Sequence, residues 1–342
     1  MAGPSSTRQP ARPRFFTDVD GDGGGTAAVG ATDPGANARA EIVAGLAAPG
    51  MRIAPKYFYD PLGSALFTAI CQLDEYYPTR TEAAIIGQAL PELARLLPAG
   101  ATLVDLGACD CAKGLRLLQA MPFAQYAAVD ISADFLRDAL LDVQRALPGL
   151  DVLGIGADFT DGLRLPPAVR DADRVFFYPG SSIGNFTPLA ATRLLKQWRG
   201  LCRADGRLLI GVDLVKDTAT LEAAYDDAIG VTAAFNLNVL RHVNRLAGTD
   251  FDPRRWRHRA VFDAGASRIE MHLVATEDQR VNWPGGGRDV RAGESIHTEN
   301  SYKYTVEGFG RVLSSAGWRV TRAWTDDRAW FALILAEPIE TR

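Results

Sequence analysis

Residues 101 to 215 alternate short apolar runs with segments of helical character, and this alternation constrains the fold more than any other feature of the chain. A repeated strand–helix–strand order produces a parallel sheet, because right-handed crossovers place the helices on its faces. We therefore predict an α/β fold with five parallel strands in series. The predicted strands are Thr102–Leu106, Tyr126–Asp130, Asp151–Ile155, Arg174–Tyr178 and Arg207–Asp213.

The C-terminal segment is predicted to complete this sheet. A helix over residues 306–316 is followed by two extended runs, 319–324 and 330–335, which turn residues at 325–327 connect. We expect these runs to form a terminal hairpin. A dinucleotide-binding dehydrogenase would more often continue with a sixth parallel strand.

An insertion separates the five strands from the terminal hairpin. Its first half, 218–246, has helical character and its second half, 260–282, has strand-like character. Residues 1–34 are rich in Gly, Ala, Pro and Ser and bury too little apolar surface to offset their ordering entropy. The predicted division is a disordered tail (1–34), an α+β substrate-binding lobe (35–81 and 216–304) and a sheet domain (82–215 and 305–342).

The balance of charges does not predict a basic surface that would bind a polyanionic partner. Lys and Arg number 37 against 41 Asp and Glu, a net charge of −4, so we expect binding neither to nucleic acid nor to a membrane. The basic cluster 254–259 is interpreted as a solvated face. A run of about 18 apolar residues, which a membrane span needs, is absent, as is a secretory signal. We expect a cytoplasmic monomer.

Cysteine and histidine spacing argues against disulfides and metals. The four cysteines, at 71, 109, 111 and 202, are too few for a disulfide framework and lack the paired spacing of zinc sites. They suit a reducing compartment. The four histidines also lack metal-motif spacing, so we expect no metal.

The segment YPGSSIGNF follows the fourth predicted strand. In open α/β sheets, ligands bind beyond the carboxyl ends of the strands. Gly180 and Gly184 let the backbone approach a ligand in conformations closed to other residues, and Asn185 supplies a carboxamide. We predict that this segment binds a small polar ligand; a plain Gly/Ser turn with a capping Asn is the alternative.

Three successive strand ends carry groups suited to a nucleoside. Gly107 lies in the turn after the first strand, which opens a helix near Lys113. Asp130 ends the second strand, where a carboxylate can accept hydrogen bonds from both ribose hydroxyls. Asp158 and Phe159 follow the third strand, where an acid can reach an adenine amino group and a ring can stack on the base.

The same strand ends indicate which cofactor to expect. Acidic residues beside a turn with few glycines suit a cofactor that has no phosphate and carries a positive sulfonium, and S-adenosylmethionine fits that description. The alternative for each aspartate is an N-cap or turn role after a strand. Acids in phase at three successive strand ends, in the acidic segment 105–110 around Gly107, at Asp130 and at Asp158, favour the cofactor.

Longer motifs stand in a fixed order along the chain. They are PKYFYDPLGSALF (55–67), EYYPTRTE (75–82), PGSSIGNF (179–186), GVDLVKDTATLEAAYDD (211–227), GVTAAFNLNVL (230–240), IEM (269–271) and IHTENSYKY (296–304). By these motifs the chain resembles the histidine-specific Nα-methyltransferases of ergothioneine biosynthesis, from about residue 37 to the C-terminus. Its predicted sheet likewise resembles the Rossmann-like class I methyltransferase fold.

The resemblance implies an activity and a set of roles. The activity is S-adenosylmethionine-dependent methylation of the α-amino group of L-histidine to N,N,N-trimethylhistidine (hercynine), the first step of ergothioneine biosynthesis. Lys113 keeps the family's lysine in the cofactor turn. The implied substrate contacts are Asn185 and Tyr225 for the carboxylate and amine, Tyr59 and the Gly180 backbone along the amine and methyl path, and Tyr76, Met271, Glu299 and Ser301 around the imidazole.

One residue departs from the pattern of such methyltransferases. The usual turn has a second glycine two residues after the first, where this chain has Cys109. A side chain is tolerated there if the backbone keeps a negative φ. The substitution puts the affinity for the cofactor in question.

The chemistry of the residues agrees with the implied roles. An amine must be neutral to attack a sulfonium methyl, and Asn185 and Tyr225 donate hydrogen bonds to a carboxylate without adding charge. Glu299 and Ser301 lie two apart, on one face of an extended strand. Glu299 as an acceptor and Ser301 as a donor or acceptor can fix one imidazole tautomer or bind the cation.

Two other functions stay open. One is methylation of another aromatic amino acid such as tryptophan, for which Met271 and Glu299 are the discriminating positions, and the retained glutamate favours histidine. The other is a non-catalytic homologue that binds a nucleoside or amino acid, which Cys109 motivates.

Overall fold

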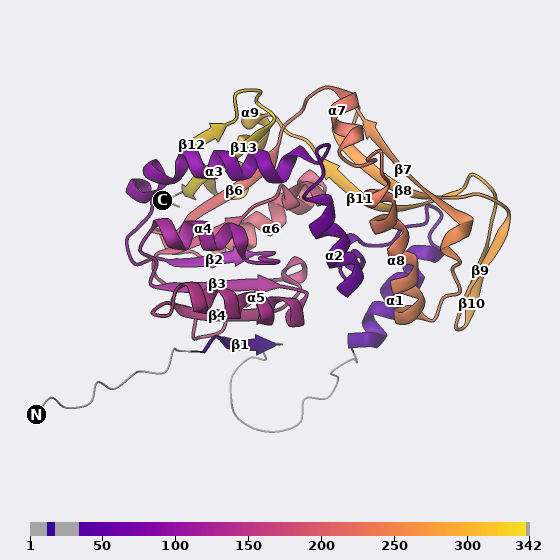
Figure 1. The fold of residues 1–342 in the computed structure, drawn as a ribbon, viewed down its shortest axis with the longest axis horizontal. Helices are drawn as coiled ribbons and strands as arrows, with labels where there is room; N and C mark the ends of the chain where they lie inside the picture. Colours follow the sequence, from indigo (N-terminus) through magenta and orange to yellow (C-terminus); the bar gives the residue numbers. More distant parts are fainter. Residues whose placement is uncertain (1–11, 18–33, 340–342) are drawn as a thin grey trace, which may run out of the picture.

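A mixed, eight-stranded sheet forms the centre of the computed structural model, which describes residues 12–17 and 34–339 (Figure 1). The first six strands in spatial order run parallel, and the last two are antiparallel to their neighbours. In spatial order the strands are β1 (Arg14–Thr17), β4 (Asp151–Gly156), β3 (Gln125–Asp130), β2 (Thr102–Leu106), β5 (Arg174–Tyr178), β6 (Arg207–Asp213), β13 (Phe331–Pro338) and β12 (Trp318–Thr325).

The five predicted parallel strands and the terminal hairpin are confirmed. The predicted bounds of β2, β5 and β6 coincide with the observed ones, and β3 and β4 are each one residue longer. Strands that are covered on both faces read as continuous apolar runs, which is why their ends could be located from the sequence. All carboxyl ends of β2 to β6 lie at one edge of the sheet, where ligands of such sheets bind.

Helices cover both faces of the sheet. The helices α3, α4 and α5 pack on one face, and α6 and α9 pack on the other, each with a separate buried apolar cluster. Trp198 on α6 is fully buried and stacks on Phe176 of β5 at 6.5 Å between ring centroids. The helices are α3 (Tyr77–Leu96), α4 (Ala112–Ala120), α5 (Ala133–Ala146), α6 (Pro188–Gly200) and α9 (Val306–Ser315).

A second group of elements packs beside the carboxyl edge of the sheet, on the right in Figure 1. Its apolar cluster joins residues 42–77 with residues 221–296, so segments far apart in the sequence share one core. We propose the division into lobes on this ground. Its elements are α1 (Pro34–Ala47), α2 (Pro61–Ile70), α7 (Thr218–Ala223), α8 (Val231–Ala247), the sheet β11 (Ser295–Tyr302), β8 (Arg268–Ala275) and β7 (Trp256–Asp263), and the hairpin β9 (Gln279–Trp283) and β10 (Gly286–Val290).

The prediction of a disordered tail over residues 1–34 is wrong for β1. This strand extends the sheet beside β4, and the Arg14 guanidinium pairs with Asp151 at 2.8 Å. The ring of Phe15 lies over Gly154, where an added Cβ would come within 2.4 Å of it. The Arg137 guanidinium covers the ring at 4.3 Å. Residues 1–11 and 18–33 of the predicted tail lie outside the described residues.

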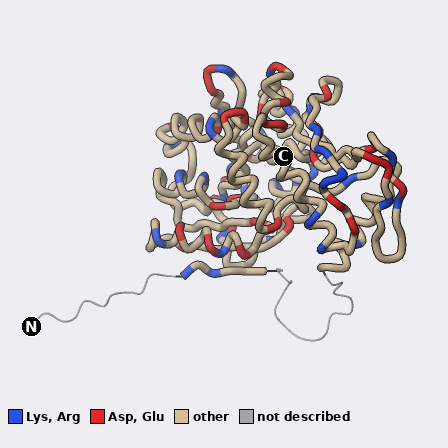
Figure 2. The backbone as a smooth tube through the Cα atoms, turned by 45° about the vertical axis from the view of Figure 1, so that its right-hand side comes forward, with Lys and Arg blue, Asp and Glu red and all other residues tan. Residues whose placement is uncertain are grey.

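Charged residues of both signs are interspersed along the backbone (Figure 2). Within residues 12–17 and 34–339, no helix combines the length and the apolar composition needed to cross a membrane. The monomeric state and the cytoplasmic location stay predictions from the sequence.

Phe15→Ala is expected to lower the free energy of unfolding by about 1–3 kcal/mol, because a partly buried ring is lost and a gap opens over Gly154. Urea unfolding followed by circular dichroism measures this change. The matched control is Phe135→Ala on α5, whose side chain is 38% exposed and whose loss should cost less. Equal effects of the two variants would show that β1 contributes no packing energy.

Candidate active site

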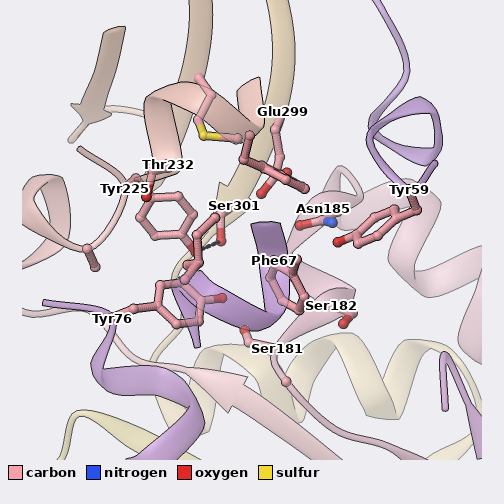
Figure 3. A pocket seen from close by; sticks show the side chains of 15 residues that line it. Tyr59, Phe67, Tyr76, Ser181, Ser182, Asn185, Tyr225, Thr232, Glu299 and Ser301 are labelled. Carbon is pink, nitrogen blue, oxygen red and sulfur yellow. Dashed lines mark hydrogen bonds between the residues drawn. The ribbon is translucent and has the colours of Figure 1, made fainter. Parts of the chain in front are cut away.

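A pocket lies where the carboxyl edge of the central sheet meets the second lobe (Figure 3). It holds about 520 Å³ of space free of atoms, including its open mouth. The eight residues expected to contact the substrate all line it: Tyr59, Tyr76, Gly180, Asn185, Tyr225, Met271, Glu299 and Ser301. The sequence analysis missed seven further lining residues: Phe67, Ile70, Ser181, Ser182, Ala224, Thr232 and Phe235.

The turn after β5 forms one wall of the pocket. Gly180 and Ser181 both have positive φ, 78° and 57°, so the chain reverses sharply at the strand end. Gly184 has no room for a side chain, since an added Cβ would lie 2.9 Å from the Tyr302 carbonyl oxygen of β11. The alternative of a capping Asn185 is wrong, because Thr187 caps α6 by accepting a hydrogen bond from the Ala190 amide at 3.3 Å.

Two polar groups that line the pocket have no hydrogen-bond partner within the described parts of the chain. Figure 3 shows the Asn185 carboxamide and the Glu299 carboxylate directed into the same space. Among the described residues, none forms a hydrogen bond with either side chain. Burial raises the pKa of Glu299 to about 7, although the nearby Lys303 lowers it. These unpaired groups leave a donor, an amide oxygen and a carboxylate available to a ligand.

A hydroxyl pair forms the wall opposite Asn185. The Tyr225 hydroxyl and Ser301 Oγ are 2.7 Å apart, and Lys303 Nζ donates to both, at 2.9 and 2.8 Å. Lys303 Nζ also pairs with Asp213 at 2.7 Å. The sequence analysis did not single out Lys303. Its alternation with Glu299 and Ser301 along one strand face was the signal that could have found it.

Aromatic rings enclose the rest of the pocket. Phe67 contacts Tyr59 and Tyr76 edge-on, with ring centroids 5.8 and 6.2 Å apart, and Tyr76 contacts Tyr225 at 6.1 Å. Burial raises the pKa of Tyr59 and of Tyr76 well above the usual range of tyrosine. Both rings therefore stay neutral phenols and can donate hydrogen bonds.

Glu82 on α3 connects the pocket to the first strand end. It is fully buried, and its carboxylate accepts from the Gly180 amide at 2.8 and 2.9 Å and from Lys113 Nζ at 2.5 Å. An added Cβ at Gly211 would lie 2.0 Å from Glu82, so β6 needs a glycine there. Lys113, which was predicted to bind the cofactor, lies between the turn after β2 and the turn after β5.

The predicted nucleoside-binding residues lie at the ends of β2 and β3. Gly107 is exposed and has a φ of 68°. Asp130 accepts hydrogen bonds from the amides of Cys109 and Ser132 at 2.9 and 2.8 Å. Each of its oxygens keeps room for a second donor. Burial raises the pKa of Asp130, and the backbone hydrogen bonds oppose this effect.

The backbone at Cys109 does not keep the negative φ that would make a side chain tolerable. Its φ is 50°, in the left-handed region that favours glycine. The amide of Cys109 is nevertheless held by Asp130. The residue thus occupies a glycine-like conformation with a β-carbon present, and this conformation costs about 1–2 kcal/mol.

Asp158 and Phe159, the last two residues predicted to bind the cofactor, follow β4 and lie in different environments. Asp158 pairs with Lys56 of the second lobe at 3.2 Å and accepts from the Thr160 amide at 3.0 Å. The pKa of Asp158 is lowered: burial raises it, but these hydrogen bonds and the charge of Lys56 outweigh burial. Phe159 is partly buried and packs edge-on against Tyr178, 5.8 Å between centroids.

No group of three His, Cys, Asp or Glu side chains in the described parts of the chain has an arrangement that could hold a metal ion.

Comparison with known proteins gives a consistent family. Residues 38–338 match the family model described as "Histidine-specific methyltransferase, SAM-dependent". A histidine N-alpha-methyltransferase of Mycolicibacterium smegmatis is 41% identical to this chain, over 90% of this chain and 97% of that protein. A histidine N-alpha-methyltransferase of Mycobacterium tuberculosis is 39% identical, over 87% and 94%. Ergothioneine biosynthesis protein 1 of Neurospora crassa is 32% identical over 82% of this chain, which spans 32% of that protein.

Glu82→Ala is expected to destabilise the protein by about 3–5 kcal/mol, because it leaves a partly buried lysine and a buried backbone turn without their shared acceptor. Urea unfolding measures the change. Glu92→Ala on the same helix is the control, since the Glu92 side chain is 30% exposed and pairs with Arg322 at the surface. A loss of less than about 1 kcal/mol in the Glu82 variant would contradict its role at the centre of two turns.

Proposed function

Since the chain belongs to the histidine-specific, S-adenosylmethionine-dependent methyltransferases, we propose that it methylates the α-amino group of L-histidine. The product is N,N,N-trimethylhistidine, and the reaction serves ergothioneine biosynthesis. The observation that supports this proposal most is the pocket beside Gly180, which is lined by the Asn185 carboxamide and the Glu299 carboxylate, neither hydrogen-bonded to another described residue. The sheet, with antiparallel β13 between β6 and β12, has the class I methyltransferase arrangement.

The ends of β2, β3 and β4 fit the nucleoside part of S-adenosylmethionine. Gly107 brings an exposed turn to this edge, and Asp130 is held by two amides with acceptor sites left for ribose hydroxyls. We assign Asp158 and Phe159 to the adenine and Lys113 to the cofactor turn. The cofactor supplies an electrophilic methyl group on a sulfonium.

The pocket fits an amino acid with a polar ring. We assign the carboxylate and amine of histidine to Asn185 and Tyr225, and the path of the amine to Tyr59 and the Gly180 backbone. Four other lining residues surround the imidazole of the substrate: Tyr76, Met271, Glu299 and Ser301. Among them, Glu299 accepts a hydrogen bond from a ring N–H.

Catalysis in this arrangement consists mainly of positioning. Methyl transfer is an in-line displacement, and holding the amine in line with the methyl carbon replaces an entropically costly encounter. Tyr59 and Tyr76 do not act as phenolate bases, because burial keeps their pKa values far above neutral pH. We propose that the amine loses its proton to water before or during binding and that Tyr59 orients it by a hydrogen bond.

Mass spectrometry of a reaction with S-adenosylmethionine and all twenty amino acids tests the proposal. The expected result is histidine carrying three additional methyl groups, with S-adenosylhomocysteine released. Methylation of tryptophan instead would favour the alternative aromatic substrate, whose indole has an N–H for Glu299 but no acceptor nitrogen. Binding of ligands without release of S-adenosylhomocysteine would identify a non-catalytic homologue.

Asp130→Ala is expected to weaken S-adenosylmethionine binding by about 1.5–3 kcal/mol, the range for losing a hydrogen bond to a charged group. Isothermal titration calorimetry measures the dissociation constant. The control is Asp134→Ala on α5, a carboxylate that is 98% exposed and pairs only with Arg137. Unchanged affinity in the Asp130 variant would remove this residue from the cofactor site.

Glu299→Ala is expected to lower kcat/KM for histidine far more than for tryptophan, because the ring N–H of histidine, the substrate that the closed pocket matches, is left without its acceptor. Asn185→Ala should instead lower both values alike, since all amino acids share the carboxylate and amine. The measurement is the ratio of kcat/KM for histidine over tryptophan in the two variants. If Glu299→Ala leaves this ratio at the wild-type value, the carboxylate does not read the imidazole.

A further inference from the structure

Lys303 lies behind the pocket wall, and each of the three N–H groups of its ammonium has a hydrogen-bond acceptor. Its side chain is fully buried, and Nζ reaches Asp213 at 2.7 Å, the Tyr225 hydroxyl at 2.9 Å and Ser301 Oγ at 2.8 Å. An ammonium has three N–H donors and no acceptor. Three donors therefore meet three acceptors, two of which are hydroxyls that line the pocket.

This saturation limits what the hydroxyl pair can offer a ligand. Each oxygen already accepts one hydrogen bond from Lys303, and the two hydroxyls are bonded to each other at 2.7 Å. If Tyr225 donates to Ser301, both lone pairs of Ser301 Oγ are filled, so Ser301 can only donate to a ligand and Tyr225 can only accept. If Ser301 donates to Tyr225, the two roles are exchanged. The pair always presents one donor and one acceptor, on opposite oxygens.

Glu299 determines which of the two arrangements suits a histidine. Its unpaired carboxylate takes the N–H of a neutral imidazole, which leaves the second ring nitrogen in need of a donor. Ser301 then donates to the ring, and Tyr225 accepts from the substrate amine. In the first two transfers, an acceptor at this position orients the amine by an N–H and leaves the nitrogen lone pair free for the methyl group. The dimethylated amine of the third transfer has no N–H, so this contact is absent from that step.

We propose that Lys303 is a positioning residue that determines specificity: by saturating the Tyr225–Ser301 pair, it couples recognition of a ring acceptor nitrogen to the placement of the amine. The inference rests on the proposed function, because it assumes that Ser301 faces the imidazole and Tyr225 the amine. It selects the neutral imidazole over the imidazolium, which has no acceptor nitrogen and would lie near the Lys303 charge.

Asp213 keeps Lys303 charged in this buried position. Burial alone lowers the pKa of Lys303, but the charge of Asp213 and the hydrogen bonds of the cluster outweigh it and raise the pKa above the usual value. The same carboxylate binds Lys216 at 2.6 Å on its other oxygen. Lys216 contacts the Tyr77 hydroxyl and no hydroxyl of the pocket.

Lys216 therefore provides a matched control for a purely structural role of Lys303. Both lysines are almost fully buried and both neutralise Asp213. Replacing either by methionine removes one buried charge from the same cluster. Only Lys303→Met removes the N–H groups that donate hydrogen bonds to the Tyr225 and Ser301 hydroxyls.

The test compares three substrates at about pH 7.5, where the imidazole is mostly neutral and Lys216, whose pKa burial lowers to about 8, keeps most of its charge. These are histidine, β-(pyrrol-2-yl)alanine, whose ring has an N–H and no acceptor, and β-(thiazol-4-yl)alanine, whose ring has an acceptor and no N–H. The readout is kcat and KM for each substrate in the wild type, Lys303→Met, Lys216→Met and Ser301→Ala. Ser301→Ala is a small change that keeps the ion cluster, so it tests the proposal even if Lys303→Met fails to fold.

The wild type is expected to prefer histidine over the pyrrole analogue strongly, with the loss for the analogue mainly in kcat. Lys303→Met and Ser301→Ala should each reduce this preference at least tenfold, while Lys216→Met keeps it within about threefold. The preference over the thiazole analogue, which Glu299 determines, should stay unchanged in Lys303→Met.

An unaltered preference over the pyrrole analogue in Ser301→Ala or in a folded Lys303→Met overturns the inference. Equal changes in the two lysine variants also overturn it and assign Lys303 to stability alone. A wild type that methylates no histidine refutes the proposed function itself, whereas histidine methylation with unchanged ratios refutes only the role of Lys303.

Discussion

The buried carboxylate of Asp213 is the group on which the geometry of the site depends. It ends β6, and it accepts the Tyr77 hydroxyl of α3 at 2.8 and 2.9 Å and pairs with Lys216 and Lys303. Its own amide donates to Ser181 Oγ in the turn after β5 at 2.8 Å. One residue thus ties the turn after β5 and the start of α3 to Lys303, whose ammonium holds the pocket's hydroxyl pair.

A buried cluster of this kind is costly unless every member is satisfied. Burial lowers the pKa of Lys216 to about 8, although Asp213 raises it, so this lysine loses much of its charge just above neutral pH. The remaining Asp213–Lys303 pair then carries no net charge. Removing one partner leaves the other charged groups buried without compensation. The two lobes that supply these groups must therefore pack together before the pocket can form.

The sequence predicted the sheet well because its strands are buried on both faces and bounded by turn residues. Gly180 and Asn185 were predicted from their place after a buried strand, whereas the other six pocket residues came from motif resemblance, since their spacing along the chain is uninformative. Asp213 and Glu82 could not be predicted, because an isolated acidic residue reads as solvent-exposed until its tertiary partners are known. β1 was missed because its four residues of strand character, RFFT, are surrounded by Gly-, Ala- and Pro-rich chain, a composition that predicts disorder.

Apart from the Glu299 carboxylate, which we assign to the imidazole, the charges at this site lie behind its walls, and this placement suits methyl transfer to an amine. A lysine inside the pocket would repel the sulfonium, and a free carboxylate beside the amine would hold its proton. Lys303 and Glu82 instead act through hydroxyls and the Gly180 amide, which transmit orientation without bringing full charge to the amine. Because the tyrosines stay neutral as well, the rate must come from alignment, and alignment requires the rigid ion pairs beneath the surface.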